Sequence, residues 1–317
     1  MKYKINYLVV IALLVVLVGC SDPVSQDNGV KIGYTPLVYG QPSFVANDLG
    51  FFKEQGIDAE MVKFESSAQV VNALLAGELD FVAVAPCLSV FAAEEKSKDS
   101  LFKVYYYNTD SLEHPISFLL VKKGSKIKGL EDLKGKKIGV FPGNILSRTS
   151  AQLLLKDIMD VKRDITFVDV GPQIQAQAIE SGMVDAMFSL EPYATLSLEQ
   201  GVAEILYVAP QLSIMDNVPG ACGFSSAKFV SERLKVASKM RIALDKSVDY
   251  IRKNEMESKK VFAKYTPLTE DIALKVRQPE FVKSTEMNGG ALQKEYDVML
   301  REGIFNNGLN AKELVLS

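Results

Sequence analysis

The sequence predicts an α/β protein with two lobes, each a mostly parallel sheet covered by helices. Two observations support this prediction. Strand-like segments alternate with helical segments through residues 30–188, and such alternation is typical of parallel sheets covered by helices. The pattern also occurs twice, because two motifs from the first half of the chain recur in the second half.

The repeated motifs lie at nearly the same distance from each other in both halves. Lys31-Ile32-Gly33 is echoed by Lys137-Ile138-Gly139, 106 positions later. Ala73–Asp80 is echoed by Ala178–Asp185, 105 positions later. Since both echoes fall in order and in register, we expect the two halves to share one architecture.

The periodicity of apolar residues assigns the individual elements. In the first half these are a strand at 30–34, a helix at 44–55, a strand at 57–61, a helix at 70–75 and a buried strand at 81–85. In the second half they are a strand at 137–141, a helix at 147–157, a strand at 165–170, a helix at 174–181 and a strand at 184–188. Gly56 and Gly77 follow the first two helices, where glycine favours a left-handed cap.

Helices dominate the C-terminal third of the chain. Strand signals fade after about Gly220, and helices are predicted at 227–254, 257–264 and 295–302. We expect this block to return to the first lobe, so that the chain crosses between the lobes near 113–118 and again near 217–224. Lobe one is therefore predicted to comprise residues 30–116 and 221–317, and lobe two residues 117–220.

The N-terminus has the features of an export signal. Lys2 and Lys4 precede an apolar run that ends at Leu17-Val18-Gly19-Cys20, which resembles a bacterial lipobox. The run is shorter than the roughly 20 residues that span a membrane; a retained anchor helix is the alternative. We expect residues 1–19 to be a signal peptide and 20–29 a lipidated Cys20 with a polar tether. The body would then work outside the cytoplasm, on the outer face of the cell membrane or in the periplasm.

Composition excludes several classes of function. The chain has 317 residues, 48% of them hydrophobic and 24% charged, with a formal charge of −3. Without a cluster of lysine and arginine, nucleic acid is a poor partner, because its binding requires neutralisation of phosphates. No heptad seam is evident, and we expect a monomer.

Reactive side chains are sparse. Cys87 and Cys222 remain besides Cys20, and we expect free, partly buried thiols rather than a disulfide between them. His114 is the single histidine. No nucleophile motif, P-loop or metal-ligand spacing is present. We therefore expect no catalytic residue, no metal site and no cofactor.

Ligands of open α/β sheets bind beyond the carboxyl ends of the strands. Applied to both halves, this rule selects Pro36, Leu37, Tyr39, Ser66, Ser67, Pro86, Cys87, Asn144, Ser147, Arg148, Glu191 and Tyr193 as candidate ligand-binding residues. The segment from Asn144 to Arg148 opens a predicted helix, whose amides favour an anion; an ordinary turn capped by Ser147 is the alternative. Glu191 is placed to accept hydrogen bonds from an amino group, and both tyrosines offer stacking faces.

Several segments carry a resemblance to a known family. They are Asp48–Ile57, Ala73–Asp80, Leu130–Val140, Ser181–Ala186 and Glu191-Pro192-Tyr193. In order and spacing they resemble the nitrate/sulfonate/thiamine-pyrimidine (SsuA/THI5-like, NMT1) family of ABC-transporter substrate-binding proteins. The resemblance implies a type II periplasmic-binding-protein-like fold, closing on a small molecule that is delivered to an ABC permease and its ATPase. Family members often have a tryptophan before the acid-proline pair, where this chain has Ser189-Leu190.

The identity of the ligand stays open at this point. Sulfonate, nitrate and aminopyrimidine are all compatible with the resemblance, although Leu37 and Ile145 beside the predicted site disfavour a bare inorganic anion. A ligand-sensing lipoprotein that reports to a membrane partner is the alternative function. An enzyme is a weaker alternative, because the eukaryotic thiamine-pyrimidine synthase of this fold has a cysteine cluster and a cytosolic location that this chain lacks.

Overall fold

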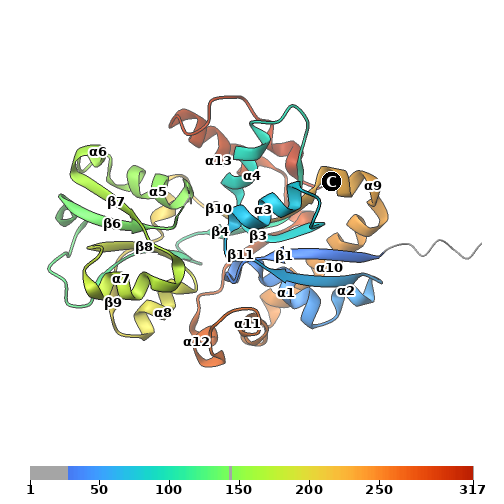
Figure 1. The fold of residues 1–317 in the computed structure, drawn as a ribbon, viewed down its shortest axis with the longest axis horizontal. Coiled ribbons are helices and arrows are strands. Elements are labelled where there is room, and N and C mark those ends of the chain that lie inside the picture. Colours follow the sequence, from blue (N-terminus) through green and yellow to red (C-terminus); the bar gives the residue numbers. More distant parts are fainter. Residues whose placement is uncertain (1–27, 143–144, 317) are drawn as a thin grey trace, which may run out of the picture.

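The computed structural model describes residues 28–142 and 145–316. The predicted signal peptide, Cys20, most of the tether and Asn144 lie outside the described residues. Within the described residues, two separate sheets are each covered by helices (Figure 1). We refer to the half with the six-stranded sheet as lobe one and to the half with the five-stranded sheet as lobe two.

The described residues begin in lobe one. Its first elements are β1 (Gly29–Tyr34), η1 (Val38–Gly40), α1 (Gln41–Asp48), α2 (Phe51–Glu54), β2 (Asp58–Lys63), α3 (Ser67–Leu75), β3 (Phe81–Pro86), α4 (Cys87–Glu94) and β4 (Phe102–Asp110). The helix predicted at 44–55 is two helices, because Gly50 adopts a left-handed conformation with φ of 77° and ends the first of them. Glycine is the residue that takes this conformation without steric cost.

Lobe two follows with a similar order of elements. They are β5 (Ser117–Lys122), η2 (Leu130–Leu133), β6 (Lys136–Val140), α5 (Ile145–Leu155), α6 (Val161–Asp164), β7 (Ile165–Asp169), η3 (Pro172–Ile174), α7 (Gln175–Ser181), β8 (Ala186–Leu190), α8 (Tyr193–Glu199), β9 (Ala203–Val208) and η4 (Pro210–Ser213). The five elements predicted for this half are all present within a few residues of their predicted bounds.

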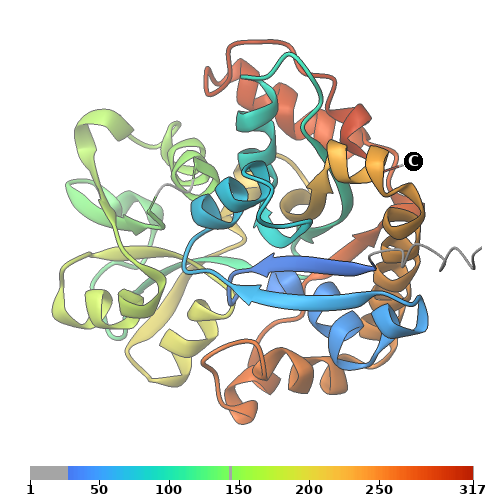
Figure 2. The ribbon, with the colours of Figure 1, turned by 45° about the vertical axis from the view of Figure 1, so that its right-hand side comes forward.

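The C-terminal block returns to the first sheet. It comprises β10 (Val218–Ser226), α9 (Ala227–Glu232), α10 (Leu234–Lys253), α11 (Glu255–Ala263), α12 (Glu270–Lys275), β11 (Glu280–Lys283), η5 (Ser284–Glu286), α13 (Gly290–Arg301) and η6 (Ala311–Leu314). Figure 2 shows this orange-to-red part of the chain wrapped around lobe one. The long helix α10 packs its buried face against α1 and α2.

Both sheets are mixed, whereas mostly parallel sheets were expected. The strand orders are β11-β4-β10-β3-β1-β2 and β7-β6-β8-β5-β9. Among the strands of the described residues, β2-β1-β3 and β7-β6-β8 form the parallel triplets. The strands that enter from the other lobe, β10 and β5, lie antiparallel beside β3 and β8, and the remaining strands continue antiparallel.

The repeated motifs make the same hydrogen bonds in each lobe. The backbone N–H of Lys31 donates to Asp80 Oδ2 at 2.8 Å, and that of Lys137 donates to Asp185 Oδ2 at 2.9 Å. The N–H groups of the two aspartates return bonds to the carbonyls of the two lysines at 3.0 and 2.9 Å. Each motif therefore joins the central strand of a parallel triplet, β1 or β6, to the segment that leads into the neighbouring strand, β3 or β8.

The glycines of the repeat allow close packing. A Cβ atom at Gly33 would lie 2.4 Å from a methyl group of Leu79, and one at Gly139 would lie 2.4 Å from the sulfur of Met187. The two halves thus retain glycine at the same place for the same steric reason.

Cys87 and Cys222 form a disulfide, so the expectation of free thiols is wrong. Cys87 follows directly on β3, and β10 lies next to β3 with Cys222 opposite Ala85. The Cα atoms of the two cysteines are 5.3 Å apart, although the residues are separated by 135 positions in sequence. The sequence predicted β3 but not β10, and the proximity of the two thiols follows from the pairing of these two strands.

The two chain crossings are held together by a small polar cluster. Asp110, at the end of β4, accepts hydrogen bonds from the Ile116 N–H at 3.0 Å and from the Ser117 hydroxyl. The Ser117 hydroxyl oxygen accepts from the Gln211 N–H on the second crossing at 3.3 Å. Burial raises the pKa of Asp110 to about 6, while these hydrogen bonds oppose the rise.

Candidate ligand-binding site

A cavity of about 840 Å³ lies between the two lobes. Its walls include Pro36 after β1, Pro86 at the end of β3, Phe141 after β6 and Leu190 at the end of β8. These are the carboxyl ends of corresponding strands in the two repeats, where the topology of open sheets places a ligand. Both lobes therefore contribute to one site.

Four helices begin at this cavity. Ser66 caps α3, its hydroxyl accepting from the Gln69 N–H at 3.3 Å, and Pro86 precedes α4. On the other side, Ile145 and Tyr193 are the first residues of α5 and α8 and line the cavity. The partial positive charge of a helix N-terminus favours electron-rich groups. The cavity therefore has a favourable potential for the polar head of a ligand without a cationic side chain at its centre.

The structure brings together seven of the candidate residues chosen from the sequence. Pro36, Leu37, Tyr39, Ser66, Ser67, Pro86 and Tyr193 all line the cavity. Four others lie outside this lining, namely Cys87, Ser147, Arg148 and Glu191. Asn144 lies outside the described residues.

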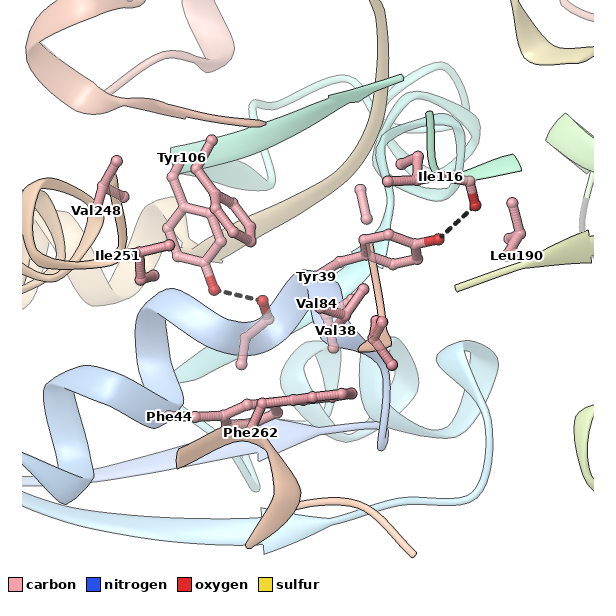
Figure 3. Packing of buried hydrophobic residues seen from close by; sticks show 14 of the residues in the cluster. Val38, Tyr39, Phe44, Val84, Tyr106, Ile116, Leu190, Val248, Ile251 and Phe262 are labelled. Atoms are coloured by element: carbon pink, nitrogen blue, oxygen red, sulfur yellow. Dashed lines mark hydrogen bonds between the residues drawn. The ribbon is translucent and has the colours of Figure 1, made fainter. Parts of the chain in front are cut away.

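Two tyrosines form aromatic walls of the cavity. Tyr39 is buried and donates a hydrogen bond to the backbone carbonyl of Ile116 at 3.4 Å, next to Leu190 of lobe two (Figure 3). Burial raises the pKa of Tyr39 well above its ordinary value, and the nearby carboxyl groups of Glu191 and Asp110 add to the rise. The ring of Tyr193 packs edge-on against Phe141, and burial raises its pKa to about 12. Both phenols therefore stay neutral and serve as hydrogen-bonding, apolar surfaces.

Arg148 is directed to a neighbouring strand. Its Nη2 donates to Asp169 Oδ1 at 3.0 Å, and its guanidinium lies 5.0 Å from the centre of the Phe167 ring. Both contacts are at β7, away from the cavity lining. Ser147, one residue earlier on α5, is completely buried. The strand-end rule located this helix start correctly but gave no information about the direction of these side chains.

Glu191 is a buried member of a polar cluster. Its Oε1 accepts from the Thr195 hydroxyl at 2.9 Å and from Arg277 Nη1 at 3.2 Å, and its Oε2 accepts from the Thr195 N–H at 3.2 Å. Burial raises the pKa of Glu191, whereas Thr195 and Arg277 oppose the rise. Arg277 also lies 4.5 Å from the ring centre of Phe118. In this conformation the carboxylate is occupied by protein donors.

Cys87 does not line the cavity. The residue is fully buried, and its sulfur is bonded to Cys222. Cys87, a candidate ligand-binding residue, is therefore not part of the cavity lining, and its sulfur is not a free thiol.

Two buried polar residues of the lining were not among the predicted site residues. Thr35 and Gln211 are exposed by only 4% and 2%; Thr35 directly follows β1, and Gln211 lies in η4, shortly before the second crossing. Thr35 Oγ1 and Gln211 Oε1 have no hydrogen-bond partner within the described residues. A buried polar atom without a partner is costly, which makes these two oxygens candidates for ligand contact. Thr35 directly precedes the predicted Pro36, whereas no sequence signal distinguishes Gln211.

The described lining has little chemistry for catalysis. Its charged side chains are Glu65 and Lys96, both exposed. It contains no histidine and no cysteine. In the part of the chain that the structure describes, no cluster of three or more potential metal ligands is found, and no helix has the length and apolar character needed to cross a membrane. The arrangement is suited to binding an organic molecule through apolar contact and a few hydrogen bonds.

Comparison with solved structures defines the class of fold. The periplasmic aliphatic sulphonate binding protein SsuA from Escherichia coli is similar with a TM-score of 0.71, at 17% sequence identity, over 92% of this chain and 92% of that one. The protein therefore has the fold of the periplasmic binding proteins. The NMT1/THI5-like family description matches residues 39–258, and the chain belongs to this family.

Two relatives in sequence indicate how the family has diversified. The "Putative aliphatic sulfonates-binding protein" of Bacillus subtilis is 30% identical over 212 residues, which are 64% of this chain and 61% of that protein. The 4-amino-5-hydroxymethyl-2-methylpyrimidine phosphate synthase THI12 of Saccharomyces cerevisiae is 26% identical over 259 residues, 78% of this chain and 74% of that protein. The chain is thus similar both to a protein named as a binder and to proteins named as enzymes.

Proposed function

We propose that this protein is an extracytoplasmic solute-binding lipoprotein that captures a small organic molecule between its lobes and delivers it to an ABC importer. The observation that carries the proposal is the cavity lined by the carboxyl ends of corresponding strands from both lobes. A ligand that contacts both lobes favours their closure in proportion to its differential affinity for the closed state. The relative named as a sulfonate-binding protein supports the same role.

The N-terminal sequence supports the extracytoplasmic part of the proposal. The lipobox-like segment before Cys20 would attach the protein to a membrane, near a permease and its ATPase. An oxidising compartment also suits the disulfide between Cys87 and Cys222, because such bonds persist outside the reducing cytosol.

The ligand is proposed to be an organic molecule with a polar head, either a sulfonate or an aminopyrimidine. Four helix N-termini favour the oxygens of a sulfonate. Alternatively, the unpartnered oxygen of Gln211 suits an N–H donor such as a ring amino group. In both cases Tyr39 and Tyr193 would contact the body of the ligand.

Mass spectrometry of the protein purified without denaturation tests the proposal. We expect an organic ligand to co-purify and to be returned unchanged after incubation. Small-angle scattering should show a smaller radius of gyration in the ligand-bound protein than in the emptied protein. Equal radii in the two states would contradict capture by closure.

An enzyme is the second candidate, favoured by the relatives named as pyrimidine phosphate synthases. It predicts chemical conversion of the bound molecule, which the same mass measurement detects. The described lining supplies no histidine or cysteine for such a reaction. A ligand-sensing lipoprotein would use the same cavity, and it differs from an importer component in lacking permease and ATPase genes beside its own.

A further inference from the structure

The cavity continues from the cleft into a groove within lobe one. Helices α3 and α4 both begin at the cleft, after Ser66 and Pro86, and then lead away from it. The residues that line the cavity along them are Ala68, Val71, Asn72 and Leu75 of α3, Ser89, Ala92 and Ala93 of α4, and Lys96 just beyond α4. We call this set the α3–α4 groove.

The spacing of these residues shows that each helix presents one continuous stripe. Positions 68, 71, 72 and 75 and positions 89, 92, 93 and 96 both follow the i, i+3, i+4, i+7 pattern of one helix face. Seven helical residues rise by ~10 Å, which gives the length of the groove. It stays open because the members of the second stripe that lie within α4, Ser89, Ala92 and Ala93, are small.

The groove is lined mainly by apolar side chains, with Asn72 and Ser89 as polar members, and reaches the surface at its far end. Val71 is buried, while Leu75 is 48% exposed, although leucine gains free energy from burial. Ser97, Leu101 and the exposed Lys96 lie at the outer end. An apolar chain in the groove would cover Leu75 and exclude water from both helix faces.

Polar atoms that require a ligand lie in the same cavity. The buried oxygens of Thr35 and Gln211 have no partner within the described residues, and both residues line the cleft portion. The cleft has buried polar atoms without a protein partner, and the groove has apolar surface. Together they match a molecule with one polar end and one apolar end.

We propose that the α3–α4 groove is a tail subsite, which holds the apolar tail of a ligand whose polar head is bound in the cleft. The proposal rests on the proposed capture function and specifies its ligand class: an organic molecule with one polar head and an apolar tail of up to ~10 Å. A small compact anion would leave the groove empty. Specificity for chain length is then set by Ala92 and Ala93, whose small side chains keep the groove open.

Two series of probes test the groove with the full-length protein. One is the n-alkanesulfonates from methyl to octyl, and the other is the n-alkanamides with the same tails. We expect affinity to rise by up to about fourfold per methylene until the groove is filled, the factor for burial of one methylene group. The series whose shortest probes bind with the higher affinity identifies the polar head group that the cleft prefers.

Variants locate the effect in the groove. Ala92→Leu fills it and should weaken an octyl probe at least tenfold while changing a methyl probe less than twofold. Leu75→Ser, at a half-exposed position that folding tolerates, should reduce the gain per methylene. Ala76→Leu adds the same bulk as the first variant at an exposed position outside the lining and should change neither probe.

The outcomes separate the subsite from the capture function. Binding of short probes without a gain from chain length, or equal weakening of short and long probes by Ala92→Leu, would overturn the tail subsite and leave capture intact. Absence of binding throughout both series would also overturn the tail subsite. The capture function is then decided independently by the mass spectrum of the co-purified molecule.

Discussion

Single polar residues distinguish the ligand site from the surrounding core. Thr35 and Thr195 are both almost fully buried, yet the Thr195 hydroxyl donates to Glu191 at 2.9 Å whereas the Thr35 hydroxyl has no partner among the described residues. A group that is kept buried without a partner lowers stability. Its retention is explained when a ligand supplies the partner.

This contrast gives a paired prediction for two isosteric substitutions. Thr35→Val should raise the free energy of unfolding of the ligand-free protein by ~1 kcal/mol and weaken ligand binding about tenfold, since it removes an unpaired hydroxyl that the ligand satisfies. Thr195→Val should lower the free energy of unfolding by ~1–3 kcal/mol, because Glu191 loses a donor. Denaturant unfolding and calorimetry check both. A Thr35→Val variant with unchanged affinity would exclude this hydroxyl from the site.

Asp110 should make stability depend on pH. Burial raises its folded pKa to about 6 from 3.8, so the folded protein binds more protons than the unfolded chain between these values. The contribution of Asp110 to the free energy of unfolding therefore falls as pH rises from 4 to 6, by up to ~3 kcal/mol. Asp110→Asn keeps an acceptor for the Ile116 N–H and removes the titration. The free energy of unfolding of Asp110→Asn minus that of the unchanged protein should therefore increase as pH rises from 4 to 6. A difference that is constant with pH would contradict this prediction.

Among the secondary-structure elements, the parallel triplets were predictable and the antiparallel strands were not. The strands of the triplets are apolar-rich segments separated from the neighbouring helices by glycine or turn residues, and Phe81–Ala85 is a continuous apolar run of this kind. In contrast, β10 has the sequence Val-Pro-Gly-Ala-Cys-Gly-Phe-Ser-Ser, whose proline and glycines are unfavourable in strands. It is nevertheless almost fully buried, since β3 and β4 lie on both sides of it. Tertiary context, rather than local propensity, makes this segment a strand.

The site residues likewise divide into those that the sequence could predict and those whose orientation depends on tertiary context. The rule for strand ends placed Pro36, Pro86 and Tyr193 at the cavity, because it depends only on topology. It failed to show that Arg148 turns toward Asp169 and that Glu191 turns toward Arg277. Those directions depend on β7 and on the C-terminal segment after α12, which are distant in sequence.

The repeat glycines yield a prediction at the scale of the strands. Gly33→Ala should lower the free energy of unfolding by ~1–3 kcal/mol, since its Cβ would lie 2.4 and 2.5 Å from Leu79 and Val70. Gly139→Ala should cost less, because its single severe contact is with the flexible Met187. Gly308→Ala, where a Cβ meets nothing within 4 Å, is the control. Thermal unfolding ranks the three, and equal losses at Gly33 and Gly308 would contradict the packing argument.

At the scale of the whole molecule, the lobes are connected by more than the two chain crossings. The end of α12 and the segment that follows it belong to the C-terminal block of lobe one but contact lobe two. Arg277 pairs with Glu191 and lies against Phe118, and Lys275 pairs with Glu199 on α8. On another side of the interface, Lys156 of α5 lies 3.2 Å from Glu302, directly after α13. Ion pairs thus bridge the lobes at positions outside the ligand cavity.

The buried member of these pairs should dominate their energetics. Arg277→Met leaves the Glu191 carboxylate without its cation in a fully buried position, so we expect a loss of ~2–4 kcal/mol in the free energy of unfolding at pH 7. Lys275→Met, which removes an exposed pair, should cost less than ~1 kcal/mol.

Removal of Arg277 raises the pKa of Glu191 further, because this cation opposes the effect of burial. The loss should therefore shrink as pH falls and the carboxyl group becomes protonated, a trend that Lys275→Met does not share. Unfolding of the three proteins between pH 4 and 7 tests this, and a pH-independent cost of Arg277→Met would show that the arginine acts through its packing on Phe118 instead of its charge.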